Sequence, residues 1–321
     1  MTPAQRVLRV VVLAGAAIGL IAPATAVHAE PSPSEIRQQI SKASADLETI
    51  VEQYNKTNEH LTASKAASAA LAARIAPLER EVAKAESGVA DMAADAYKQG
   101  HASAVGALLS ADSTDGFLRR LSTLDQLARS RQEAVAGFTA TRARYQAQKQ
   151  KLDAVLATQA AQASQLAARK AKIEKDLDRL YELRREAYGS ATSSGSSYSG
   201  NVPSVSGKAG VAVRYAYGAI GSPYVWAADG PDGYDCSGLT LAAWRAAGES
   251  LSHNAAMQWD EVAHIARSEL QPGDLVFYAG LGHVAIYVGN GNIIHAPTFG
   301  ESVKIADVDV MPPYGYGRVR T

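Results

Sequence analysis

Cysteine is almost absent from this chain: among 321 residues it occurs once, at Cys236. A single cysteine excludes an internal disulfide and the Cys-x-x-Cys pairs that hold structural zinc. Charge of one sign is also lacking, because 32 lysines and arginines balance 32 acidic residues. A chain without net charge has no electrostatic reason to bind nucleic acid or an anionic membrane surface. We therefore expect no nucleic-acid partner, no metal and no cofactor.

Long apolar runs are scarce as well, and the one at the N-terminus predicts export. Residues 10–21 are apolar, they follow Arg6 and Arg9, and small residues at 27 and 29 precede a candidate cleavage point. This arrangement is typical of a secretory signal peptide, which we place at residues 1–29. Cleavage after residue 26 is one alternative. A retained anchor is another, although the stretch is short for a membrane span. Cleavage would leave a secreted chain with a net charge of −2.

Residues 30–188 predict an all-α antiparallel coiled-coil hairpin. From Ile36 to residue 96, apolar and small residues recur at alternating steps of four and three, which is the heptad pattern of a coiled coil. Ser32 is placed to cap the first helix, with Pro33 at its first position and Glu35 reaching back to the cap. Pro77 lies inside the pattern and is expected to kink or split the helix there.

The heptad phase breaks between residues 99 and 116, and a second heptad runs from Phe117 to Leu180. We expect an irregular tip over 99–116, with the two helices returning side by side. The hairpin would be on the order of 100 Å long, at 1.5 Å per residue. A parallel dimer of two long helices is the alternative reading of the same pattern. The charged heptad positions are expected to face solvent.

The composition changes after the hairpin. Residues 189–206 begin with nine glycines or serines in twelve positions, which predicts a flexible linker. Residues 207–321 contain all three tryptophans and are enough for one compact domain. Within it, helices are expected over 208–219, 236–247 and 254–266. Strands are expected over 275–278, 283–288 and 292–296, and residues 312–317 are expected to form a loop before a last strand. The order of these elements indicates an α+β domain.

Two histidines flank the hairpin formed by the last of these strands. A strict two-residue turn would put His283 and His295 on opposite faces of the sheet. A three-residue loop over 289–291 pairs 285 with 295, and makes the two histidines diagonal neighbours on one face. We favour the three-residue loop, because one histidine can then serve as a base and the other can orient it.

Cys236 follows Asp235, a plausible helix cap, and so begins the helix over 236–247. Unpaired backbone N–H groups at a helix start favour the thiolate form of cysteine. An inert, buried cysteine is the alternative, since free cysteine often behaves as a small apolar residue. A lone thiol in an exported chain is otherwise prone to oxidation, which favours a chemical role.

Five strings of the domain, in order, resemble the NlpC/P60 family. They are Pro-Tyr-Val-Trp at 223–226, Asp-Cys-Ser-Gly-Leu at 235–239, Pro-Gly-Asp-Leu-Val-Phe at 272–277, Gly-His-Val-Ala-Ile-Tyr at 282–287 and Ile-His-Ala at 294–296. The resemblance covers about 208–321. It implies a compact papain-like α+β fold and a cysteine endopeptidase that cuts peptidoglycan stem peptides, typically between D-γ-glutamate and the diamino acid.

Carried over to this chain, the resemblance makes Cys236 the nucleophile, His283 the base and His295 the orienting residue. It places Tyr224 beside the nucleophile, and it makes Asp235 and Ser237 substrate-binding. One departure is visible. Where many members have Leu-Pro-Arg-x-Ser, this chain has Leu-Ser-His-Asn-Ala at 251–255, so that His253 replaces the arginine and Ala255 the serine.

The sequence therefore predicts an extracellular, cell-wall endopeptidase acting on peptidoglycan stem peptides. An amidase that cuts the sugar–peptide link with the same thiol chemistry is one alternative, and a non-catalytic wall-binding scaffold is another. The N-terminal hairpin resembles the coiled coils of related hydrolases, which implies regulation or docking on a membrane division-complex protein. The linker spans roughly 20–25 Å, which is short enough for the coil to fold back and cover Cys236.

Overall fold

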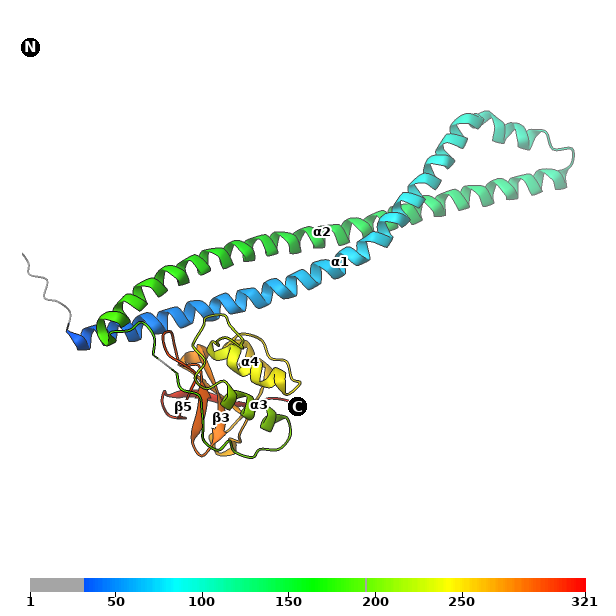
Figure 1. Ribbon diagram of the computed structural model, residues 1–321. Coiled ribbons are helices and arrows are strands. Elements are labelled where there is room, and N and C mark those ends of the chain that lie inside the picture. Colours follow the sequence, from blue (N-terminus) through cyan, green and yellow to red (C-terminus); the bar gives the residue numbers. More distant parts are fainter. Residues whose placement is uncertain (1–31, 194) are drawn as a thin grey trace, which may run out of the picture.

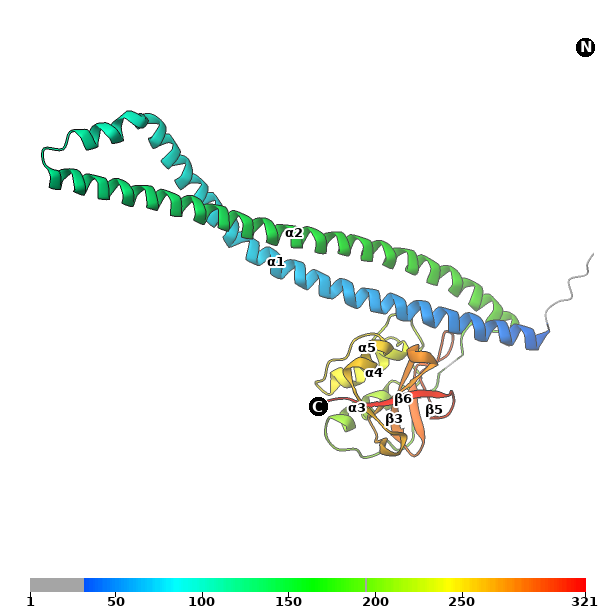
Figure 2. The same ribbon diagram turned by 180° about the vertical axis from the view of Figure 1, so that it is seen from behind.

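The structure is a computed structural model that describes residues 32–321, except residue 194 and the side chains of 99–105, 107 and 108. A long helical hairpin lies beside a small α+β domain, which packs against the first half of helix α1 (Figures 1 and 2). The predicted signal peptide at 1–29 falls outside the described residues. Among those that are described, no helix is both long and apolar enough to cross a bilayer.

Helix α1 spans Pro33–Leu109 and begins as its sequence predicts. The backbone N–H of Ser32 donates to the Glu35 carboxylate at 2.7 Å, and the N–H of Glu35 donates to the Ser32 hydroxyl at 3.3 Å. This reciprocal pair is a capping box, which satisfies two backbone donors that the helix itself leaves unpaired.

The predicted split at Pro77 is wrong, because α1 continues through it as one helix. Pro77 is exposed, so the carbonyl of Ala73 that loses its helical partner can be hydrated by water. The predicted irregular tip is also shorter than expected. The helix runs through Gly100 and Gly106, since one glycine costs a helix only about 1 kcal/mol.

Helix α2 spans Thr114–Tyr188 and returns along α1. It starts at Ser113, whose side chain accepts a hydrogen bond from the N–H of Gly116 at 3.1 Å. Buried seam residues come from both helices: Ile36, Ile40, Leu47, Leu61 and Ile75 from α1, and Ile173, Leu177 and Leu180 from α2. The heptads therefore pair within one chain, and the antiparallel hairpin is confirmed.

The segment after α2 has no helix or strand among its described residues, as expected of a linker, but it is held against the domain. Arg184, which is buried, donates from Nε to the carbonyl of Ala191 at 2.8 Å and from Nη2 to that of Gly300 at 3.0 Å. The N–H of Ser193 also donates to Gly300, at 2.7 Å. These bonds fix the base of the hairpin to the domain.

The domain contains three α-helices and one six-stranded sheet. The helices are α3 (Gly207–Gly218), α4 (Cys236–Ala246) and α5 (Ala255–Glu261), with short 3₁₀ turns η1 (Arg267–Glu269) and η2 (Ala279–Leu281). The strands are β1 (Ala263–Ile265), β2 (Leu275–Tyr278), β3 (His283–Gly289), β4 (Asn292–His295), β5 (Lys304–Asp307) and β6 (Pro313–Arg318). They are antiparallel in the order β1-β6-β2-β3-β4-β5, which confirms the α+β class.

Two sequence expectations for this domain were wrong. The helix expected over 254–266 ends at Glu261 and gives way to β1, and the loop expected over 312–317 is strand β6. Gly315 lies where Trp259 crosses the strand, and a Cβ there would come within 2.5 Å of the Trp259 ring. The glycine at 315 therefore allows Trp259 to pack closely against strand β6, although proline and glycine in such a segment usually indicate a turn.

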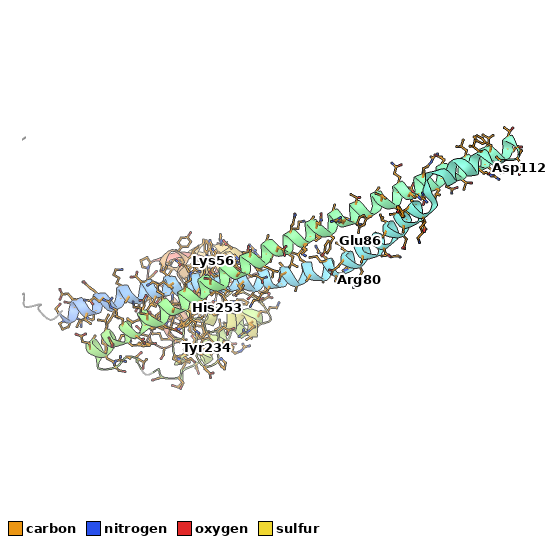
Figure 3. All side chains as sticks on the ribbon, turned by 90° about the horizontal axis from the view of Figure 1, so that it is seen from above. Lys56, Arg80, Glu86, Asp112, Tyr234 and His253 are labelled. Carbon is orange, nitrogen blue, oxygen red and sulfur yellow. The ribbon has the colours of Figure 1, made fainter. Side chains whose placement is uncertain are left out.

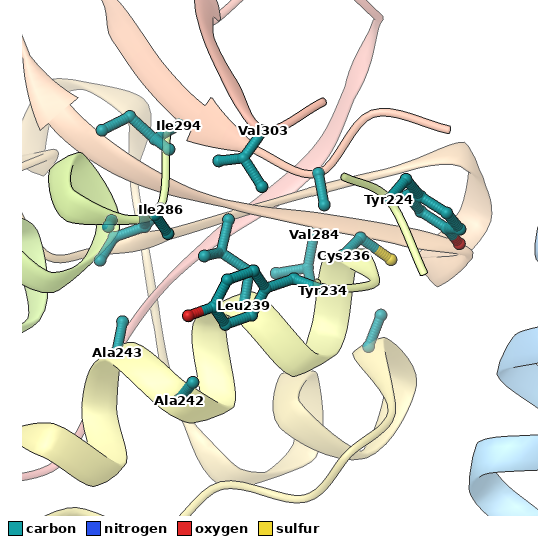
Figure 4. Packing of buried hydrophobic residues seen from close by; sticks show 14 of the residues in the cluster. Tyr224, Tyr234, Cys236, Leu239, Ala242, Ala243, Val284, Ile286, Ile294 and Val303 are labelled. Atoms are coloured by element: carbon teal, nitrogen blue, oxygen red, sulfur yellow. The ribbon is translucent and has the colours of Figure 1, made fainter. Parts of the chain in front are cut away.

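The core of the domain lies between α4 and the sheet. Figure 4 shows Leu239, Ala242 and Ala243 of α4 facing Ile286 of β3 and Ile294 of β4. Small residues on α4 let the helix approach the sheet closely, which brings its first residue to the start of β3. The site is built at that junction.

We predict that Pro77→Ala stabilises the hairpin, because it restores one helical hydrogen bond and relieves the ring clash. The free energy of unfolding should rise by about 2–3 kcal/mol. Urea unfolding followed by circular dichroism at 222 nm measures it. Glu79→Ala, on the same exposed turn, should change little; a lower or equal midpoint for Pro77→Ala would contradict the prediction.

Candidate active site

The two histidines meet, but the predicted three-residue loop is wrong: Gly289 pairs with Asn292, so the turn contains only Asn290 and Gly291. A register shift between Tyr287 and Gly289 then pairs Ile286 with Ile294, which is the register expected from the longer loop. His283 Nε2 lies 3.0 Å from His295 Nδ1, and both side chains are buried. His283 Nδ1 has no hydrogen-bond partner among the described residues. One ring nitrogen of His283 is thus held by His295 and the other is left for a reacting proton.

Cys236 is the first residue of α4, and its helix is capped as expected. The Asp235 carboxylate accepts a hydrogen bond from the N–H of Gly238 at 2.7 Å. The start of β3 lies beside this turn, since the backbone N–H of Val284 contacts the Cys236 sulfur. Val284 follows His283 directly, so the fold brings the thiol and the histidine pair into one region (Figure 4).

The other predicted site residues also lie here. Ser237 is fully buried, and its hydroxyl is 3.3 Å from Asp235 Oδ1. Tyr224 is buried against Phe299, with ring centroids 4.7 Å apart. All six predicted residues are therefore gathered around the start of α4 and the β3–β4 hairpin. Among the residues that the structure describes, no three His, Cys, Asp or Glu side chains are arranged to hold a metal ion.

Helix α1 covers this site and inserts Glu52 into it. The Glu52 carboxyl accepts from the Ser237 hydroxyl at 2.9 Å and from the Ala255 N–H at 2.7 Å, and lies 3.8 Å from the Cys236 sulfur. Figure 4 shows the sulfur pointing toward the side where the pale blue ribbon of α1 lies. Only 2% of Cys236 is exposed, so α1 leaves no room for a substrate at the thiol.

Further contacts extend along the same face of α1. The Asn55 side-chain amide donates to Asp235 Oδ2 at 2.9 Å, and Glu59 accepts from the His253 N–H at 3.1 Å. Tyr54 meets Trp226 edge to face, with ring centroids 5.4 Å apart. Figure 3 shows the hairpin passing over the domain near His253. Together these contacts fix α1 across the site over about two helical turns.

His253 contacts Asp235 and is not directed at solvent. Its Nε2 lies 2.9 Å from Asp235 Oδ1 and 3.0 Å from Oδ2. Burial acts to lower the pKa of His253, but the charge and hydrogen bond of Asp235 outweigh it and raise that pKa. Asp235 thus has two partners outside its own helix turn, Asn55 and His253, and a third, Ser237, within it.

The electrostatics of the covered site hold the thiol in its protonated form. Burial raises the pKa of Cys236 well above its ordinary value. The charges of Glu52, Asp235 and Glu48 raise it further, and two of these three residues belong to α1. The helix start was expected to favour the thiolate, but in this conformation burial and neighbouring carboxyls outweigh it.

The two histidines are also held neutral. Burial lowers the pKa of His283 to about 4. Burial, with smaller effects of His283 and Lys304, lowers the pKa of His295 to about 2. A neutral imidazole can accept a proton from the thiol, so His283 retains the form that a general base needs.

Glu52, Asn55 and Glu59 were not indicated by the sequence, and the expectation that charged heptad positions face solvent is wrong for Glu52. Glu52 as a whole residue is only 7% exposed, and its carboxyl packs against the domain. The only signal is the spacing of 52, 55 and 59, which places them on one face of α1. Polar residues at such spacing normally mark a hydrated face, so sequence alone offered no reason to bury them.

Comparison with known proteins assigns the domain. Residues 221–314 match the model of the NlpC/P60 family, so this part of the chain is an NlpC/P60 domain. The chain is similar to the peptidoglycan endopeptidase RipA of Mycobacterium tuberculosis, with 33% identity over 159 residues, covering 44% of this chain and 34% of RipA. It is also similar to "Probable endopeptidase Cgl2188" of Corynebacterium glutamicum, with 44% identity over 94 residues, covering 29% of this chain and 45% of that protein.

Among solved structures, the NlpC/p60 domain of the peptidoglycan hydrolase SagA is similar, at 36% identity and a TM-score of 0.33. That match covers 35% of this chain and 98% of the SagA domain. The chain spans less than half the length of the two curated relatives above.

We predict that Cys236 of the intact chain reacts slowly with iodoacetamide, because α1 buries the thiol and raises its pKa. Glu52→Ala should speed alkylation on the order of tenfold or more, since each pKa unit changes the thiolate fraction tenfold. Mass spectrometry reads this cleanly, as the chain has one cysteine. Glu86→Ala, on α1 but away from the domain (Figure 3), is the matched control. Equal rates for the two variants would show that α1 does not protect the thiol.

Proposed function

We propose that this protein is a secreted, cell-wall peptidoglycan endopeptidase that cuts stem peptides at the D-γ-glutamyl–diamino acid bond. The observation that carries the proposal is the junction of α4 and β3 within an NlpC/P60 domain, where the Cys236 sulfur contacts the N–H of Val284, directly after His283, and His283 bonds to His295. The similarity to a peptidoglycan endopeptidase supports the substrate class. An exported chain would meet peptidoglycan outside the membrane.

The proposed reaction uses the three side chains in distinct roles. His283 takes the thiol proton, and the sulfur of Cys236 attacks the γ-carbonyl carbon to form a tetrahedral intermediate. That intermediate collapses to a thioester, and His283 returns the proton to the departing amine. Water, deprotonated by the same imidazole, then hydrolyses the thioester and frees the thiol. His295, 3.0 Å from His283 Nε2, orients the imidazole throughout.

The proposal includes regulation by the hairpin. In the structure Glu52 and Asn55 of α1 bond to Ser237 and Asp235, which are the predicted substrate-binding residues. Substrate and α1 would therefore compete for the same groups. A partner that draws α1 away would switch the enzyme on, and a membrane division-complex protein is the partner that the coil resemblance implies.

We predict that Asn55→Asp activates the intact chain on purified peptidoglycan. The substitution keeps the size of the side chain but places a carboxylate against Asp235, and like-charge contacts cost several kcal/mol. Release of soluble fragments should increase by about tenfold or more. Asn58→Asp makes the same change at an exposed position of α1 and should leave the rate unchanged. Equal rates for both variants would argue against inhibition by α1.

In the Asn55→Asp background, we predict that Cys236→Ala abolishes hydrolysis, and that His283→Ala lowers it by about 10²–10⁴-fold through loss of the base. His295→Ala should be milder, because water can partly replace an orienting group. Mass spectrometry of the fragments identifies the bond.

Fragments ending in D-γ-glutamate support the endopeptidase, whereas a free lactyl group would indicate an amidase and no cleavage would indicate a scaffold. If His295→Ala were more damaging than His283→Ala, the two roles would be exchanged. Circular dichroism of each variant separates loss of chemistry from loss of fold.

A further inference from the structure

The Glu52 carboxyl is held by catalytic-domain groups beside the nucleophile. Its Oε2 accepts from the Ala255 N–H at 2.7 Å and from the Asn254 side-chain amide at 2.6 Å. Its Oε1 lies 2.9 Å from the Ser237 hydroxyl and 3.8 Å from the Cys236 sulfur. Ser237 and Asn254 are 0% and 2% exposed. We call Ser237, Asn254 and the N–H of Ala255 the Glu52 site; all three groups belong to the domain that carries the nucleophile.

The two ends of the Glu52 site differ in what they can bind. At one end, Asn254 and Ala255 present two N–H donors, which require an acceptor oxygen. At the other end, the Ser237 hydroxyl can donate or accept, and it lies 3.3 Å from Asp235 Oδ1. When the hydroxyl donates to Asp235, its lone pair faces the site. The site then fits a group with one acceptor and one donor, which describes a neutral carboxyl or a carboxamide.

The charges around the site favour a neutral occupant. Burial, followed by the charge of Asp235, raises the pKa of Glu52 and so favours its neutral form. His253 opposes this shift in part, but its ring bonds to Asp235. The titratable groups around the site are Asp235, Cys236, His253 and Tyr224 from the domain and Glu48 from α1. A free carboxylate bound there would lie beside the same buried Asp235.

The substrate class of the proposed function, on which this inference rests, offers a group of this kind. A glutamyl residue linked through its γ-carbonyl keeps a second carboxyl at its α-carbon, either free or amidated. That group is four bonds from the carbonyl carbon that Cys236 would attack, or roughly 5 Å when extended. Glu52 Oε1, at 3.8 Å from the sulfur, lies within that reach.

We propose that the Glu52 site binds the α-carboxamide of the γ-glutamyl residue, so that the enzyme prefers amidated stem peptides to those with a free α-carboxylate. Asn254 is then a substrate-binding residue, and Glu52 closes the enzyme as a neutral mimic of the carboxamide. His253 stands where the family motif has arginine, and it pairs with Asp235. The raised pKa of His253 gives that position positive charge, but the ring bonds to Asp235 and makes no bond to the Glu52 carboxyl, so its charge is largely offset by Asp235.

The preference can be tested by binding stem peptides to the intact chain that carries Glu52→Ala and Cys236→Ala. The first substitution opens the site and the second prevents cleavage of the peptide. Two stem peptides that differ only in α-carboxamide against α-carboxylate are titrated by calorimetry. We expect the amidated peptide to bind about tenfold more tightly at pH 7, the effect of one mismatched buried hydrogen bond. The difference in affinity between the two peptides should narrow as the pH falls to 4, because the α-carboxylate of the unamidated peptide becomes protonated. Equal affinities at pH 7, a preference for the acid, or no binding of either peptide would overturn the proposal.

A matched pair of serine variants assigns the preference to the site. Ser237→Ala, added to the same chain, removes the lone pair that receives the carboxamide N–H, so the two peptides should bind within about twofold of each other. Ser252→Ala removes a hydroxyl that bonds to Glu261 outside the site, and should keep the tenfold preference. If Ser237→Ala weakened both peptides equally, its role would be structural and the assignment wrong. Because no bond is cut, absence of hydrolysis in the digestion experiment would reject the proposed reaction and leave this result unaffected.

Glu52 itself supplies a second readout. Glutamine at 52 is a carboxamide, so Glu52→Gln should keep Cys236 as slow to alkylate as in the unchanged chain, whereas Glu52→Ala should expose it. If the site instead required a carboxylate, Glu52→Gln would open the enzyme as fully as Glu52→Ala. That result would overturn the neutral mimic.

Discussion

The burial of one carboxyl group from α1 beside the thiol determines the state of the whole molecule. Glu52 enters the site from a helix almost two hundred residues away in sequence, and it meets donors of the catalytic domain at 2.6 to 2.9 Å. A group so placed fills the space that a substrate needs and raises the pKa of Cys236. The hairpin, the linker and the face of the domain toward α1 all serve to hold that carboxyl in position.

The proposed inhibition by α1 would act on geometry and on electrostatics together. Steric cover alone would leave a reactive thiol ready whenever α1 moved slightly. Here burial also raises the pKa of Cys236, and the neighbouring carboxyls of Glu52, Asp235 and Glu48 act in the same direction, so the covered thiol stays protonated. Burial of the histidines acts in the same direction, because the imidazolium that would pair with a thiolate is disfavoured.

Features set by local pattern could be predicted from the sequence. The capping box at Ser32, the N-cap at Asp235 and the heptad seam depend on residues within a few positions of each other. The contact of His283 with His295 across a hairpin was also predictable, although its register comes from a shift in strand pairing beside a two-residue turn and not from a three-residue loop.

Features that depend on distant partners could not be predicted. Glu52 and Asn55 resemble hydrated heptad positions, and only the fold reveals the donors that they meet. Pro77 was expected to break α1, yet a single lost bond on an exposed face is small against a helix of 77 residues. The glycines and prolines of 312–317 predict a loop, but this segment is strand β6. The reason lies in a distant contact, since Gly315 packs under Trp259, 56 positions away.

The anchoring of Arg184 has a mechanical consequence. Its two bonds fix the base of the hairpin to the domain, while the bond from Arg169 to the Gln53 carbonyl marks the level of α2 that lies beside the covered site. From Arg184 this level is roughly 20 Å along α2, and the far end of the hairpin is roughly 105 Å away, at 1.5 Å per residue. A sideways force at the tip therefore acts on the site with about fivefold leverage. The hairpin would therefore act as a lever, in which a small force at the tip opposes the contacts that Glu52 and Asn55 make with the domain.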